Sequence, residues 1–407
     1  MLRNRGLVAL LAAEIVSSLG TYMTYLALPW FVLVTTGSPA RMTVVLGVQM
    51  LPIALFGIPS GTLVSKLGAR RTMLISDWAR APLMTAIPTL HALDVLSFPL
   101  LLACVFVLGC FIAPYFSSQR VILPELVGDD EQTVGKANAI VEAAQRATSL
   151  LGPSAAGVLI AFVGATNVLY IDAATFLFAA LMLTLFVPQR PPVAPTEESG
   201  GLLAGVRFLA RDRILRTLGI TALVLNGLGQ MMSAGLPVLA YQDFGGSSRV
   251  AGVFFASFGA GAVVGSLLAV KALGRIEPLR LASFSLVALT LPLFALVLDL
   301  PVWAIVAALF ASSVFGPLVN APLIAMITTK TPEALRAKVM TSVLTFALLA
   351  GPAGLFAAGP ILQAWGPHLV FGIVAGGQLA ASLFFASVAL RMPRDAVPAV
   401  PAADLRA

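Results

Sequence analysis

The sequence predicts an all-α membrane protein with twelve transmembrane helices in two halves of six. Three observations support this: an apolar composition, a series of long apolar stretches, and positive charges placed on one side. Of the 407 residues, 59% are hydrophobic and only 11% are charged, and the mean hydropathy is +0.97. Because a soluble domain carries about 25% charged residues, we expect lipid to be the main solvent of this chain.

Stretches of about 20 apolar residues are long enough to cross the hydrocarbon core as a helix. They predict spans at 7–33, 42–64, 73–92, 96–117, 138–162, 166–188, 215–240, 250–271, 279–299, 302–327, 339–363 and 367–390. Arg3 and Arg5 precede the first stretch, as in a signal peptide. That stretch is too long for one and shows no small-residue cleavage site, so we interpret it as an uncleaved span.

The lysines and arginines indicate the orientation of the chain. Arg41 and Arg249 lie in predicted outer loops, and Arg80 and Arg146 lie within spans. Nearly all the others lie in termini or loops that an even number of spans puts on one side. Since positive residues favour the cytoplasmic side, both termini are expected in the bacterial cytoplasm, with the chain in the plasma membrane. The net charge of +7 is therefore a topology signal, and no nucleic-acid partner is expected.

The hydrophilic stretch 189–214 lies at the midpoint of the chain. We interpret it as a cytoplasmic linker between an N-terminal half, 1–188, and a C-terminal half, 215–407. The halves also share a series of residues in the same order and spacing: Lys136, Gly152 and Gly157 recur as Lys338, Gly354 and Gly359. Chance recurrence of small residues is the alternative. Internal duplication is typical of secondary transporters, whose substrate site lies between the repeats near the middle of the membrane.

The loop between the second and third predicted spans carries a known pattern. It reads Gly61-Thr-Leu-Val-Ser65-Lys66-Leu67-Gly68-Ala69-Arg70-Arg71. This resembles the signature loop of the major facilitator superfamily, roughly G-x-L-a-D-r-x-G-r-r, except that Ser65 replaces the acid. In that family the acid helps to latch the two halves on the cytoplasmic side, so the latch is in question here, and Asp77 is a candidate substitute. The resemblance makes Lys66, Arg70 and Arg71 gating candidates.

A second motif lies in the fifth span, where Gly152-Pro153-Ser154-Ala155-Ala156-Gly157 resembles the G-P-x-x-G-G motif of drug antiporters. Stretches 75–81, 136–139 and 172–176 resemble the branch with macrolide-efflux proteins and enterobactin exporters. The superfamily resemblance covers the whole chain. It implies the major facilitator fold, with two six-helix bundles, alternating access and proton-coupled export. Gly152, Pro153 and Gly157 also suit close helix packing, which is the alternative to an antiport-specific role.

Charged residues inside spans are costly and are therefore functional candidates. Six lie well inside a span, and all six belong to the N-terminal half: Glu14, Asp77, Arg80, Glu142, Arg146 and Asp172. Spacings of i,i+3 and i,i+4 allow Asp77 to pair with Arg80 and Glu142 with Arg146. Structural or gating ion pairs are preferred over direct coupling for these two pairs. Asp172 lies early in its span, where an interfacial cap is expected rather than a proton relay.

Glu14 differs because it lies about two turns into its span with no basic residue near it in sequence. An unpaired carboxylate in a low-dielectric setting can exchange protons or pair with a cationic substrate. Glu14 is therefore the leading proton-coupling candidate, ahead of Asp77, Glu142 and Asp172. An ion pair with another helix, for instance through Arg146, is the alternative.

Several aromatic, amide and methionine side chains suit a loose pocket for a bulky amphipathic molecule. The candidates are Tyr22, Tyr25, Trp30, Asn226, Gln230 and Met231. Packing against neighbouring helices or lipid is the alternative for each. No cofactor and no metal site are expected, since Cys104 and Cys110 lie within one span without a Cys/His cluster.

The predicted function is secondary active export of a hydrophobic or amphipathic small molecule, such as a drug or metabolite, with the proton gradient as energy source. Uptake or facilitated diffusion of a nutrient is one alternative, and a non-transport membrane receptor is another. An enzyme is not expected, because the sequence contains no nucleophile–base constellation, phosphate loop or metal-ligand set. The expected partners are the bilayer, the substrate and protons, and the chain is expected to act as a monomer.

Overall fold

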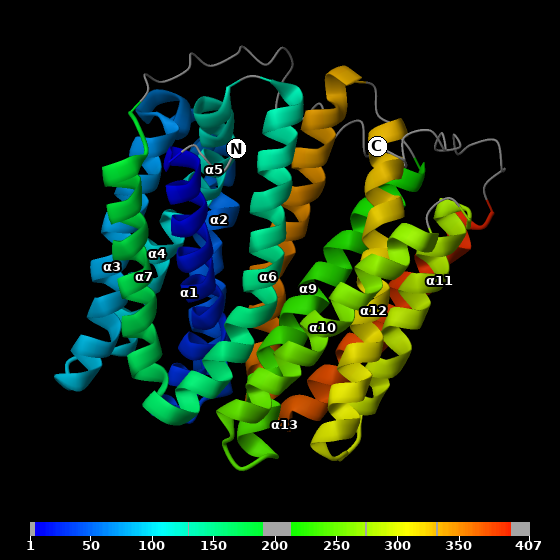
Figure 1. Cartoon of the computed structure of the whole chain (residues 1–407). Helices are drawn as coiled ribbons and strands as arrows, with labels where there is room; N and C mark the ends of the chain where they lie inside the picture. Colours follow the sequence, from blue (N-terminus) through cyan, green and yellow to red (C-terminus); the bar gives the residue numbers. More distant parts are fainter. Residues whose placement is uncertain (1–4, 129, 190–212, 273–274, 331–332, 392–407) are drawn as a thin grey trace. The chain divides into compact units, whose positions relative to one another are not determined.

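A computed structural model describes residues 5–128, 130–189, 213–272, 275–330 and 333–391 (Figure 1). The side chains at 54, 58–59, 120, 131, 213–215, 321 and 324–348 are not described. The described residues are helical or lie in turns and loops, without a β-strand. The chain divides into two compact units: unit 1 comprises Met1–Glu198 and Ala240–Ala256, and unit 2 comprises Ser199–Leu239 and Ser257–Ala407. The expected linker, 189–214, lies almost entirely outside the described residues, so the predicted domain boundaries stay a prediction.

Unit 1 is built from seven labelled helices in the described part of the chain. They are α1 (Arg5–Thr36), α2 (Pro39–Leu67), α3 (Ala69–Ala92), α4 (Phe98–Cys110), α5 (Ile112–Val127), α6 (Glu131–Val163) and α7 (Ala165–Phe186). Helix α1 packs against both α6 and α7, and α3 also packs against α7. Helix α2 packs against α4 and α5. The first helix, α1, therefore packs against α6 and α7, which come more than a hundred residues later in the chain.

Unit 2 contains most of the later helices. They are α9 (Arg213–Gln242), α10 (Ser248–Ala272), α11 (Pro278–Thr290), the 3₁₀-helix η1 (Leu291–Val297), α12 (Val302–Lys330) and α13 (Glu333–Ala389). Helix α11 packs against α12 and α13, and η1 packs against the same two helices. The last residues of α9 and the first turns of α10 belong to unit 1.

Polar caps and glycines set several helix ends. Ser38 accepts a hydrogen bond from the backbone N–H of Arg41 at the start of α2, and Gly68, with φ 83°, separates α2 from α3. Asp130 accepts a bond of 2.9 Å from the Thr133 N–H at the start of α6. The Thr133 hydroxyl also donates to this exposed carboxylate, and these two bonds lower the pKa of Asp130.

Ten helices of the described chain are long and apolar enough to cross a membrane, whereas the sequence predicts twelve spans. Helix α3, expected at 73–92, is not among the ten. Its first turns carry Arg70, Arg71, Asp77 and Arg80, and these lower its hydropathy. Helix α13 counts once although it contains the expected spans 339–363 and 367–390. Its backbone breaks at Gly366, which has φ 78°, a conformation that glycine adopts readily.

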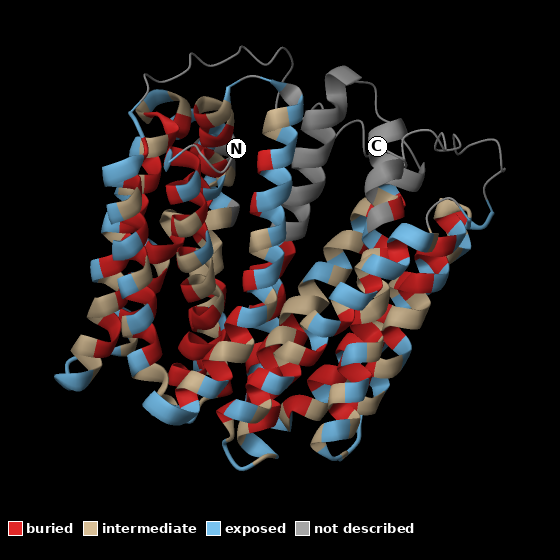
Figure 2. Cartoon of the chain, viewed as in Figure 1, coloured by how far each residue is buried: buried red, intermediate tan, exposed pale blue. Residues whose placement is uncertain are grey.

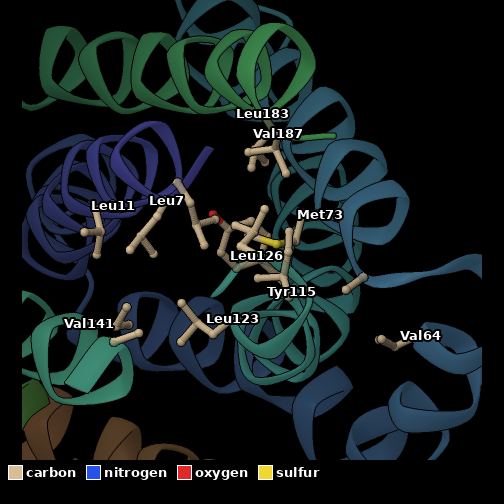
Figure 3. Close-up of a cluster of buried hydrophobic side chains, with 14 residues drawn as sticks. Leu7, Leu11, Val64, Met73, Tyr115, Leu123, Leu126, Val141, Leu183 and Val187 are labelled. Carbon is tan, nitrogen blue, oxygen red and sulfur yellow. The ribbon is translucent and has the colours of Figure 1, made fainter. Parts of the chain in front are cut away.

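The burial pattern fits a lipid-solvated protein (Figure 2). Large apolar side chains are exposed on the helices, among them Phe162, Leu267 and Trp303, which are 73%, 65% and 73% exposed. One buried cluster in unit 1 draws residues from α1, α2, α3, α5, α6 and α7, including Leu7, Met73, Leu123 and Leu183 (Figure 3). Tyr115 belongs to this cluster, which places its phenol among apolar side chains.

Candidate functional site

Glu14 lies in the apolar interior of unit 1, with 3% of the residue exposed. Its carboxylate accepts a hydrogen bond of 3.1 Å from the Tyr115 hydroxyl and another from the side-chain amide of Gln119. Gln119 in turn accepts a bond of 3.2 Å from Gln145 on α6. Two neutral donors on α5 thus hold Glu14, and Gln145 on α6 supports one of them. No ion pair to Glu14 occurs among the described residues. Arg146, the expected alternative partner, is exposed.

Asp77 and Arg80 form the expected i,i+3 ion pair, with 2.6 Å between Asp77 Oδ1 and Arg80 Nη2. Both residues are buried, since Asp77 is 0% and Arg80 6% exposed. The guanidinium lies between two rings, 4.3 Å from the centroid of Tyr115 and 4.4 Å from that of Phe176. Desolvated cation–π contacts of this kind contribute about 2 kcal/mol each. Asp77 Oδ2 has no hydrogen-bond partner in the described part of the chain.

Asp172 is not the interfacial cap that its early position in the span suggests. Gly164 is the N-cap of α7, and Asp172 lies two turns further on and is 0% exposed. Its Oδ2 accepts a bond of 2.6 Å from the Thr24 hydroxyl on α1, and its Oδ1 accepts one of 3.2 Å from Thr175. A Cβ at Gly20 would collide with Thr175 and with Asp172 Oδ1. Glycine at this position therefore makes room for the carboxylate against α1.

These three carboxylates belong to one electrostatic group. Arg80 attracts Glu14 and Asp172 in addition to Asp77. The Tyr115 ring that covers one face of Arg80 carries the hydroxyl that binds Glu14, and Phe176 on the other face lies one helical turn from Asp172. Among the described residues, the buried charged side chains are these three acids and this one base. The described part of unit 1 thus buries more acid than base, which favours a bound proton or another cation.

A pocket within unit 1 lies beside Asp172 and Arg80. Its lining consists of Thr21, Thr24, Tyr25, Gln49, Met50, Ile53, Arg80, Met84, Leu108, Ile112, Asp172 and Phe176. Tyr25 is therefore a predicted pocket residue that does line a pocket. Tyr22 packs on Tyr25, with 5.6 Å between ring centroids. Trp30 is buried and meets the ring of Tyr241 edge-on, outside this pocket.

The glycines of the fifth-span motif lie at close contacts of α6. A Cβ at Gly152 would overlap Tyr22 on α1, and one at Gly157 would overlap Gly252 on α10. The Ser248 hydroxyl also donates a bond of 3.1 Å to the Gly157 carbonyl, and Pro153 between the two glycines is buried. The motif therefore provides close packing of α6 on two neighbours. An antiport-specific role for it stays a prediction.

The second expected ion pair is not formed. Glu142 and Arg146 are exposed on α6, and no contact between them is found among the described ion pairs. An exposed pair gains little because water solvates both charges, whereas the buried Asp77 and Arg80 have no such solvation. The roles of Glu142 and Arg146 stay predictions.

The signature loop has one structural contact that its sequence did not predict. Arg70 donates to the carbonyls of Leu183 and Thr184, at 3.2 and 3.0 Å, in the last turn of α7. A cation there complements the negative end of the helix dipole. Lys66 and Arg71 are exposed. The Ser65 hydroxyl donates to the Thr62 carbonyl of its own helix, and Asp77 pairs with Arg80. The substitution of Asp77 for the missing acid stays a prediction.

In unit 2, Asn226 is exposed and donates to the Ala222 carbonyl of its own helix at 2.9 Å. Gln230 is half-buried, and Met231 is 5% exposed. None of the pocket residues described above comes from unit 2. A shared substrate cavity involving these three residues stays a prediction. The described residues contain no group of three or more His, Cys, Asp or Glu side chains that could hold a metal ion.

Sequence reasoning missed the uncharged members of the site. Tyr115, Gln119, Thr24, Thr175 and Gly20 carry no charge, and nothing in a single sequence sets them apart. Gln119 also fell beyond the expected end of a span at residue 117, whereas the candidate span here runs from Phe98 to Val127. Ser118 and Gln119, which directly follow that expected end, were the sequence signal that a polar site lies there.

Comparison with known proteins agrees with this architecture. The chain is 29% identical over 379 residues to the multidrug efflux pump Tap of Mycolicibacterium fortuitum, covering 90% of this chain and 91% of Tap. It is 28% identical over 407 residues to the pump of the same name from Mycobacterium tuberculosis, covering 96% of this chain and 94% of that one. Both alignments therefore extend over nearly the whole length of the two proteins that are compared.

Solved structures resemble the chain in fold. The nucleoside transporter NupG has a TM-score of 0.76 at 15% identity, covering 95% of this chain and 99% of NupG. A bacterial homologue of the human lysosomal transporter Spinster, in an inward-facing and unoccupied conformation, has a TM-score of 0.74 at 15% identity, covering 94% of this chain and 96% of the homologue. The family of transmembrane secretion effectors, MFS_3, matches residues 1–406. The chain is a member of this family.

Proposed function

We propose that this protein is an efflux transporter that moves amphipathic small molecules out of the bacterial cell, driven by protons. The similarity to multidrug efflux pumps along the whole chain supports the export of drug-like compounds. Membership of this family favours a transporter over an enzyme or receptor. The observation that carries the proton coupling is the excess of buried acid among the described residues of unit 1, where Glu14, Asp77 and Asp172 are accompanied by the guanidinium of Arg80.

The charge balance explains why this group suits proton coupling. The Asp77–Arg80 pair is neutral as a unit, so Glu14 and Asp172 are left without a full counter-charge. Burying an uncompensated carboxylate costs several kcal/mol, and a proton removes that cost. Protons that bind at such positions and leave on a conformational change couple the proton gradient to transport. Arg80, which lies between two aromatic rings, stays positively charged while the acids of the group gain or lose protons.

We also propose the topology that the apolar stretches and the positive residues of the sequence indicate. Twelve spans in two six-helix bundles, with both termini in the cytoplasm, accommodate α3 as a span despite its charges, because Asp77 and Arg80 are buried as an ion pair. The last two of these spans are the parts of α13 before and after the break at Gly366. In this proposal the chain works as a monomer that alternates access between the two sides of the bilayer. Cysteine accessibility on each side of the membrane, for residues introduced near Ser199 and Asp94, tests the orientation.

Everted membrane vesicles test export and coupling together. With an acidic interior, vesicles containing the protein should accumulate ethidium, and collapse of the pH gradient by nigericin should release it. Glu14→Gln should abolish the dependence on the gradient. Glu277→Gln, which alters a partly exposed ion pair with Arg280, is the matched control and should behave as the wild type, since such pairs contribute about 0–1 kcal/mol.

The alternatives predict different results in the same experiment. An uptake carrier would accumulate its substrate in right-side-out vesicles, and a receptor would move none in either orientation. Accumulation that survives nigericin would reject proton coupling while leaving export intact. Drug susceptibility of cells with and without the gene, over a panel of compounds, then identifies the substrates.

A further inference from the structure

The pocket beside Asp172 distinguishes this residue from the other two buried acids of unit 1. Asp172 contributes to the pocket lining, whereas Glu14 and Asp77 do not. Thr24, which binds Asp172, and Glu14 lie on the same helix ten residues apart, which separates them by about 15 Å along its axis. A molecule in this pocket therefore reaches one carboxylate and not the other.

Asp172 has no ion-pair partner among the described residues, although Arg80 attracts it from a distance. Its two oxygens accept hydrogen bonds from the hydroxyls of Thr24 and Thr175, and these donors bring no positive charge. Arg80 also lines the pocket, but its guanidinium is engaged by Asp77 at 2.6 Å and covered by two rings. A buried carboxylate in this state requires a proton or a cationic partner.

The remaining walls suit the apolar part of a cation. Phe176 and Tyr25 supply aromatic rings, and Met50 and Met84 supply polarisable thioethers. Aromatic faces attract cations through their quadrupole, and the Phe176 ring already has the Arg80 guanidinium at 4.4 Å. Methionines adapt to ligands of different shapes. The lining is thus compatible with an ammonium group that carries bulky apolar substituents.

We infer that this pocket is a binding subsite for the ammonium head of the exported amphiphile, with Asp172 as its counter-ion. The subsite rests on the export function proposed above and names the charge class of its substrates. Proton and ammonium compete for the same carboxylate, so binding of the cation releases a proton. Glu14, outside the pocket, takes no part in recognising the substrate.

A matched pair of probes tests the subsite. The first is a dansyl amide bearing a trimethylammonium-ethyl chain, and the second is its neutral 3,3-dimethylbutyl isostere, which has the same shape. Binding to the purified full chain in lipid nanodiscs is followed by dansyl fluorescence. The wild type should bind the cation about tenfold tighter than the isostere. Asp172→Asn should abolish this preference while binding the isostere as before, and Glu14→Gln should keep it.

A pH titration of the wild type provides a readout that requires no variant. Lowering the pH from about 8 to about 5 should weaken binding of the cation and leave the isostere unchanged. Equal binding of the two probes by the wild type, failure to bind the cation, or a preference that survives Asp172→Asn would each overturn the subsite. The gradient-driven ethidium accumulation described above is scored separately, so loss of the subsite with retained accumulation leaves the export function standing.

Discussion

The two units bury polar groups of different kinds. Unit 1 buries Glu14, Asp77, Arg80 and Asp172, whereas the buried polar residues described in unit 2 are hydroxyl side chains and Gln378. The sequence predicted this asymmetry, since the charged residues placed well inside a span, away from its ends, all lie before residue 189. The charged unit therefore has the means to bind protons or cations. The buried polar groups described in the other unit are uncharged.

The units also differ in how their buried polar atoms are satisfied. In unit 1 the acids are held by donors from other helices, such as Tyr115 and Gln119 for Glu14. In unit 2, Ser312 and Ser382 bond to helix carbonyls. Four other buried polar atoms have no partner among the described residues, namely the hydroxyls of Thr221, Ser283 and Ser285 and the Oε1 atom of Gln378. A network between helices depends on their packing, so substitutions in unit 1 should have larger effects than equivalent ones in unit 2.

Arg80→Leu should produce the largest effect. It removes the base and leaves Asp77 buried without a counter-charge, which costs about 3–5 kcal/mol. Thermal unfolding of the detergent-purified protein should show a marked loss of stability. The double variant Asp77→Asn/Arg80→Leu should recover a large part of the loss, because no uncompensated charge remains. A stable single variant would show that Asp77 is neutral in the folded protein.

The same substitution at two glutamines compares the units directly. Gln119→Leu in unit 1 removes a donor to the Glu14 carboxylate and should cost about 1.5–3 kcal/mol, as for hydrogen bonds to charged groups. Gln378→Leu in unit 2 replaces a buried amide whose oxygen is unpartnered. Its effect should be neutral or stabilising, since apolar replacement removes an unsatisfied group. Equal losses of thermal stability in the two variants would contradict the comparison.

Adding one methyl group to α6 tests how closely this helix packs against α1. Gly152→Ala would place a Cβ against Tyr22 on α1, and overpacking of this kind costs about 1–3 kcal/mol. Gly135 on the same helix has open space around it, so Gly135→Ala is the matched control and should be neutral or slightly stabilising. Unfolding temperatures of the pair give the difference, and equal values would mean that α1 and α6 separate without cost.

Two pairs of charges with helical spacing show where sequence reasoning succeeded and where it did not. Asp77 with Arg80 and Glu142 with Arg146 had similar support from spacing. The first pair forms because both groups are buried and each provides the counter-charge that the other lacks. The second does not form, since both side chains are exposed. Helical spacing shows which two charged side chains are able to form an ion pair. Burial decides whether forming the pair lowers the free energy of the folded protein.

The sequence by itself determined the class of the protein. Its apolar stretches require lipid, its motifs resemble the superfamily to which it belongs, and its buried charges fall in the first half, because each of these properties is carried by local composition. Tertiary packing decided the site. Thr24 meets Asp172, and Tyr115 meets Glu14, across more than a hundred residues of chain in each case. Such contacts depend on how helices approach one another, which the helical periodicity of a single sequence does not contain.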